Sequence, residues 1–93
     1  MTWRLIHSQK TEDDFKRLCE RARSEGRLTR VLETMKRLAQ RLKADPVNAG
    51  DPYNRLKHLG LHLYVIVDRP LVVHYAVDEQ RHWVYLRRID LLS

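Results

Sequence analysis

Apolar residues recur along the chain at two spacings, and the spacing changes near the middle. Through the first half they recur every three or four residues, as in helices that bury one face. From residue 61 to 88 they form short runs rich in Val, Ile, Leu, Tyr and Trp, as strands do. The pattern predicts helices in the first half and a sheet in the second.

The helical region is expected to follow a short strand at residues 3–7, which alternate loosely between apolar and polar types. A first helix is predicted over 11–25, with the Thr11 hydroxyl as its cap and Gly26 ending it. A second helix follows from Leu28 and stops at Asp45, because a residue before proline disfavours helical dihedrals. The short connection between the two helices predicts an antiparallel helical hairpin.

The second half predicts an antiparallel meander of strands over 61–67, 71–77 and 82–88, because the polar connections are short enough to force hairpins. Residues 46–52 are expected to form a loop, and 53–59 a further short strand or extended arm. Within the strand 61–67, one face is aliphatic and the other is mixed. We expect the aliphatic face to pack on the helices and the mixed face to be free.

These elements define an α+β fold with the order βααβββ in a single domain over residues 1–93. A chain of this length holds one hydrophobic core, and its 43% apolar and 32% charged residues are typical of a folded protein. The single cysteine, Cys19, excludes an internal disulfide and favours a reducing compartment. No apolar run is long enough for a signal peptide or a membrane span, so we expect a cytoplasmic protein.

The net charge of +6 favours an acidic partner such as nucleic acid or an acidic protein surface. Much of the charge lies on the polar side of the second helix, where Arg27, Arg30, Arg37 and Arg41 occur. Glu33 is placed to pair with Arg37, one helical turn away. We interpret this side as an ordinary solvated face.

No metal or catalytic motif is present, and we expect no cofactor and no metal site. Basic and aromatic residues nevertheless gather on the predicted sheet and its approach. They are Arg55, Lys57, His58, His62, His74, Tyr75, His82, Trp83, Tyr85, Arg87 and Arg88. Cations beside aromatic rings suit single-stranded RNA. RNA cleavage is also chemically open to them, because it needs a base, an acid and cations at the phosphate.

Each of these residues also has a plain structural explanation. His74, Tyr75 and Trp83 suit cross-strand packing in any sheet. Arg87 and Arg88 are neighbours in a strand, so we expect them to point to opposite faces and only one of them to meet a given ligand. Composition alone leaves packing and function open for the group.

The chain resembles the RelE/ParE superfamily of bacterial toxin–antitoxin toxins over nearly its whole length. The resemblance is carried by four segments: Trp3-Arg4-Leu5-Ile6-His7-Ser8, Leu42 through Asp45-Pro46, Leu56-Lys57-His58-Leu59 and Val73-His74-Tyr75-Ala76-Val77-Asp78. It implies a RelE-like endoribonuclease that cleaves mRNA on the ribosome and is neutralised by a cognate antitoxin protein. On that basis Arg87, Arg88, His58, Tyr75 and His74 are candidate catalytic residues, and Lys57 and Arg55 candidate RNA-binding residues.

The chain departs from this superfamily in three places. After the last strand, where members commonly carry a terminal tyrosine or histidine, this chain has Ile89-Asp90-Leu91-Leu92-Ser93. Ribosome-dependent members usually carry arginine or lysine in the first meander strand, where this chain has Tyr64-Val65-Ile66-Val67, and an arginine where it has Val72. These departures keep a non-enzymatic alternative open, either a ParE-like gyrase inhibitor or a diverged protein-binding module. A homodimer formed through an open sheet edge or helix face is a third reading.

Overall fold

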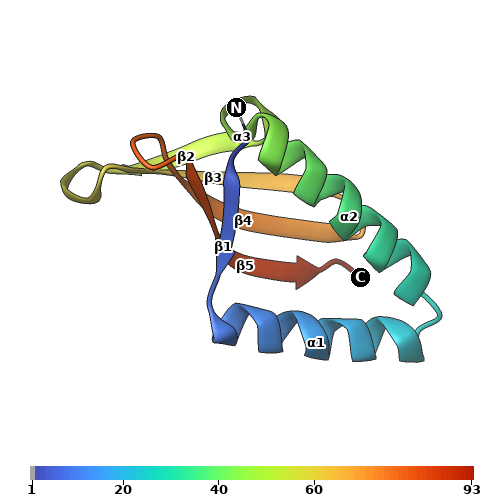
Figure 1. Ribbon diagram of the computed structural model, residues 1–93. Coiled ribbons are helices and arrows are strands. Elements are labelled where there is room, and N and C mark those ends of the chain that lie inside the picture. Colours follow the sequence, from blue (N-terminus) through green and yellow to red (C-terminus); the bar gives the residue numbers. More distant parts are fainter. Residues whose placement is uncertain (1) are drawn as a thin grey trace.

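A five-stranded sheet with two long helices against one face forms the protein (Figure 1). The computed structural model describes residues 2–93. Its elements are β1 (Arg4–His7), α1 (Gln9–Ser24), α2 (Leu28–Ala44), α3 (Pro46–Ala49), β2 (Asp51–Leu56), a 3₁₀ turn (Lys57–Leu59), β3 (Leu61–Asp68), β4 (Leu71–Asp78) and β5 (Trp83–Leu91). The predicted order of strand, two helices and antiparallel meander is confirmed.

The strands lie in the order β1-β5-β4-β3-β2. Neighbours from β2 to β5 are antiparallel, whereas β1 runs parallel to β5, with Arg4 opposite Trp83 and His7 opposite Leu86. The pairing of the first strand with the last was not predicted, because short-range pattern carries no information on it. This pairing makes β1 one edge strand of the sheet and places the start of α1 beside β5.

The first helix begins two residues earlier than predicted. Ser8 is its cap, since its hydroxyl accepts the backbone N–H of Thr11 at 3.1 Å. Thr11 instead lies inside the first turn, where its hydroxyl donates to the carbonyl of Leu86. Pro46 ends α2 as expected but then starts the one-turn helix α3 within the predicted loop, because proline is well tolerated at a first helical position.

The helices diverge in a V from their connection at residues 25–27 and cover one face of the sheet (Figure 1). Leu38 and Leu42 of α2 are fully buried there with Val31. They join buried side chains of the strands, among them Tyr64 and Ile66 of β3, in a single core.

The prediction for the two faces of β3 is therefore wrong. The mixed face packs on the helices, and the aliphatic face is turned away, with Val67 59% exposed. The ring of Tyr64 stacks on that of Tyr75 at 5.3 Å. The charged end of the mixed face, Asp68, is neutralised by Arg37 rather than buried alone, so its polarity does not oppose packing.

Arg37 ties α2 to the end of β3. Its Nε donates to Asp68 Oδ2 at 2.8 Å and its Nη2 to Oδ1 at 3.0 Å. Two parallel hydrogen bonds of this kind are the strong arrangement for a guanidinium and a carboxylate. The hydrogen bond from Arg37 is the main cause that lowers the pKa of Asp68. The expected Glu33–Arg37 pair does not form within residues 2–93, because the carboxylate of β3 takes its place.

Truncation of the buried face of α2 should destabilise the protein far more than truncation of its outer face. Leu38→Ala removes a fully buried side chain and is expected to lower the free energy of unfolding by about 2–5 kcal/mol. Leu32→Ala, at a position 48% exposed on the same helix, should change it by less than about 0.5 kcal/mol. Urea unfolding measures both, and equal losses would contradict the assigned face.

Candidate nucleic-acid interface on the open face of the sheet

The face of the sheet away from the helices, here called the open face, carries most of the candidate chemistry. Side chains opposite each other in neighbouring strands share a face, so the register assigns its members. The open face comprises Arg4, Ile6, Asp51, Asn54, Leu56, Leu61, Leu63, Val65, Val67, Val72, His74, Ala76, Asp78, Trp83, Tyr85, Arg88 and Asp90. It is apolar over β3 and becomes basic and aromatic over β5.

A β-bulge in β5 shapes the basic part of this face. His74 pairs with Arg88 and Tyr75 pairs with Leu86, so Arg87 is an extra residue with no partner on β4. A bulge interrupts strict alternation and re-aims side chains. Arg87 consequently lies on the same face as Arg88, as its contact with Tyr53 shows, and the prediction that the two arginines point to opposite faces is wrong.

Tyr53 reaches across the open face from β2. Its ring lies edge-on to that of His74, with centroids 6.1 Å apart, and its hydroxyl accepts Nη1 of Arg87 at 3.4 Å. Since β3 and β4 separate β2 from β5, this side chain bridges the sheet. Tyr53, His74, Arg87 and Arg88, here called the open-face cluster, thus come from three strands.

The two arginines of the cluster differ in their surroundings. Arg88 Nε lies 2.9 Å from Asp90 Oδ2 and is already paired with a carboxylate. Within residues 2–93 the side chain of Arg87 forms one hydrogen bond, to the Tyr53 hydroxyl, and no ion pair. Arg87 is therefore the cation better placed to bind an anion. The Nδ1 atom of His74 is buried and has no hydrogen-bond partner in the described part of the chain.

Tyr75 lies on the opposite face, in the core. It is fully buried, and its hydroxyl donates to the carbonyl of Pro46 at 2.7 Å. Burial raises the pKa of Tyr75 to about 12. A Cβ at Gly50 would approach both the Tyr75 hydroxyl and the Val65 carbonyl within 2.7 Å, so glycine is required beside it. Tyr75 orders α3 and β2 and cannot reach a ligand on the open face.

The other candidates lie at the tip of the β2–β3 hairpin, away from the cluster. Lys57 and His58 form the 3₁₀ turn, and Arg55 is opposite His62 on the helix side of the sheet. Four residues of β3 separate the turn from Val65, the neighbour of His74, which at about 3.3 Å per residue amounts to roughly 13 Å. Apart from Tyr75 in the core, the candidate site residues therefore divide into two groups.

Sequence reasoning missed Tyr53, which it placed only in an extended arm. A tyrosine four residues before Lys57 carries no signal of its own, because its role depends on contacts with β4 and β5 across the sheet. Trp83, in contrast, has a structural role at the far end of the open face. Arg81 lies 5.4 Å from its ring centroid and also pairs with the buried Asp78 at 2.8 Å.

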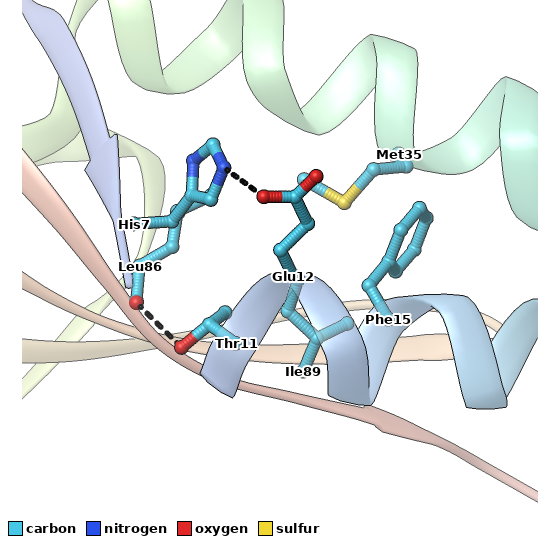
Figure 2. A pocket seen from close by; sticks show the side chains of 7 residues that line it. All are labelled: His7, Thr11, Glu12, Phe15, Met35, Leu86 and Ile89. Atoms are coloured by element: carbon cyan, nitrogen blue, oxygen red, sulfur yellow. Dashed lines mark hydrogen bonds and ion pairs between the residues drawn. The ribbon is translucent and has the colours of Figure 1, made fainter. Parts of the chain in front are cut away.

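A small pocket opens between the diverging helices on the other side of the sheet (Figure 2). It has a volume of about 120 Å³, and its walls are Phe15, Met35, Leu86 and Ile89. Figure 2 shows the ion pair of His7 with Glu12, 3.8 Å apart, at this pocket. Its walls are largely apolar, and the carboxylate of Glu12 lies beside them, so the pocket is poorly suited to an anion.

No family of proteins, curated protein or solved structure matches the chain. Residues 2–93 contain no group of three or more His, Cys, Asp or Glu that could hold a metal ion. None of the helices in this range is long and apolar enough to cross a membrane. The geometry of the open face is accordingly the main basis for a function.

Tyr75→Phe separates the structural role of this residue from a catalytic one. The variant leaves the buried Pro46 carbonyl without its donor, which should lower the free energy of unfolding by about 1–3 kcal/mol. Urea unfolding measures the loss. Any activity of the open face should persist in the folded variant, and a folded but inactive Tyr75→Phe protein would contradict this assignment.

The buried Tyr75 phenol should also make stability depend on alkaline pH. Its pKa is raised from 10.0 to about 12 in the folded protein, so the unfolded chain loses this proton first. Its contribution is fully present below pH 10 and is lost as the pH rises toward 12. Urea titrations across this interval should show a shallower decline for Tyr75→Phe. Parallel declines in both proteins would refute the buried phenol as a cause.

Proposed function

We propose that the protein is a RelE-like toxin of a toxin–antitoxin system, an endoribonuclease that cleaves mRNA on the ribosome in the cytoplasm. The observation that carries this proposal is the bulge in β5, which gathers Arg87 and Arg88 on one face with His74. The confirmed order of elements and the sequence resemblance to RelE/ParE toxins support it further. The net charge of +6 suits an RNA substrate and an acidic antitoxin.

The open-face cluster holds the groups that RNA cleavage requires. A base takes the proton of the 2′-hydroxyl, whose oxygen then bonds to phosphorus as the bond to the 5′ oxygen breaks. An acid returns a proton to that leaving oxygen. In this scheme Arg87 binds the phosphate and stabilises its developing charge, His74 accepts the 2′-hydroxyl proton and returns it to the leaving 5′ oxygen, and Tyr53 positions both side chains.

A second candidate function is a non-enzymatic binding module, such as a ParE-like gyrase inhibitor or a homodimer. Two observations favour it over the enzyme. Asp90 already pairs with Arg88, and the positions beside the cluster hold Val65, Val67 and Val72 instead of cations. On this alternative, binding depends on the apolar part of the open face, where Val67 is 59% exposed.

Controlled expression of the protein in bacteria tests the enzymatic proposal. Wild type should arrest growth and produce cleaved mRNA that primer extension detects. Arg87→Ala should reduce cleavage by on the order of 10²-fold, because the phosphate loses a preorganised cation. The matched control is Arg30→Gln with Lys36→Gln, which removes two exposed cations of α2 and should cleave like wild type.

Other outcomes of the same experiment separate the two functions. Growth indistinguishable from the vector control would refute a toxin. Growth arrest without cleaved mRNA that persists in Arg87→Ala but is lost in Val67→Ser would refute cleavage and support the binding module. A binding assay with purified gyrase then tests the ParE-like form of that module.

A further inference from the structure

The β2–β3 hairpin extends beyond the body of the protein as an ordered arm (Figure 1). This arm comprises residues 54–62, and the molecule measures 41 Å along its long axis against 23 and 21 Å across. Gly60, with φ of 66°, closes the turn, and its N–H donates to the carbonyl of Lys57. Leu59 at the tip is 55% exposed. The arm is a defined structure whose tip contributes nothing to the core.

The charge of the arm is of one sign. No acidic residue occurs between Asp51 and Asp68, a segment that contains Arg55, Lys57 and two histidines. Arg55 and Lys57 are exposed, and neither takes part in an ion pair within residues 2–93. The nearest acid by register, Asp78 opposite Leu61, is buried and paired with Arg81.

Helix α1 differs from the arm in this respect, because acids accompany most of its cations. The pairs of α1 and of the turn after it are Lys10 with Asp14, Lys16 with Glu12, Arg17 with Asp14, Arg21 with Glu25 and Arg27 with Glu25. Helix α2 is basic as well: Arg37 pairs with Asp68, whereas Arg30, Lys36, Arg41 and Lys43 form no ion pair within residues 2–93. The arm differs from α2 in that its cations lie on a projecting hairpin whose tip does not pack on the core.

We propose that the arm binds the phosphate backbone of double-helical RNA, separately from the open-face cluster. Bases in an RNA duplex are poorly accessible, whereas its phosphates line both edges of the grooves. The arm has cations for phosphates but no Phe, Tyr or Trp within residues 54–62 on which an unpaired base would stack. The choice of RNA over DNA rests on the proposed function. The contact with phosphate rests on the cations of the arm and is independent of that function.

Fluorescence anisotropy with a labelled RNA stem–loop and the full chain tests this proposal in the absence of ribosomes. Arg55→Gln with Lys57→Gln should weaken binding by on the order of tenfold and make its salt dependence shallower by about 1 to 2 in log–log slope. The matched control, Arg30→Gln with Lys36→Gln, changes the net charge equally on the helical side. This control should change neither the affinity for the stem–loop nor the salt dependence of binding.

Each other outcome counts against the proposal. Equal weakening in the arm and control variants would assign binding to net charge, and wild-type binding by the arm variant would remove the arm from the interface. If the arm variant loses binding to polyglutamate but retains the RNA stem–loop, the arm binds an acidic protein instead. Binding to the stem–loop and cleavage of mRNA are measured separately, so a protein that binds the stem–loop through the arm without cleaving mRNA contradicts the cleavage proposal and leaves this one intact.

Discussion

The single extra residue in β5 is the constraint on which the arrangement of the open face depends. In a strand of strict alternation, one of Arg87 and Arg88 would enter the helix-covered face, where a charge is costly to bury. The bulge avoids this cost and keeps Leu86 and Ile89 facing the core on either side of the interruption. The packing requirement of the core and the clustering of cations on the open face thus have one common cause.

The order of elements could be predicted from the sequence because helical and strand periodicities are local properties. Which face of each strand packs on the helices could not be predicted. Counting apolar residues favoured the aliphatic side of β3 as the side that packs on the helices. The core instead contains Tyr64 and Ile66 of the mixed side, because the ring of Tyr64 stacks on Tyr75 and Asp68 pairs with Arg37. Both partners lie in other elements, and the pairing of β1 with β5 likewise joins the two ends of the chain.

The candidate site shows the same division between local and long-range information. Residue type drew attention to His74, Arg87 and Arg88, which the fold brings together. Tyr75 has the same chemical character but faces the core, where its hydroxyl satisfies the Pro46 carbonyl. Tyr53 entered the cluster only through its reach across the sheet. Residue type identifies candidates, whereas alternation and its interruption by the bulge decide which of them share a face.

The placement of acids clarifies what a net charge of +6 means for this molecule. On α1, neighbouring carboxylates reduce the charge available to a partner, and on the open face Asp90 does so for Arg88. Arg87 and the arm have no such neighbour in the described chain, and they lie on different parts of the sheet. An anionic partner that met both would have to extend over roughly 13 Å or more, which a polymer does and a small ligand does not. The distribution of unpaired cations, more than their number, therefore favours a polyanion.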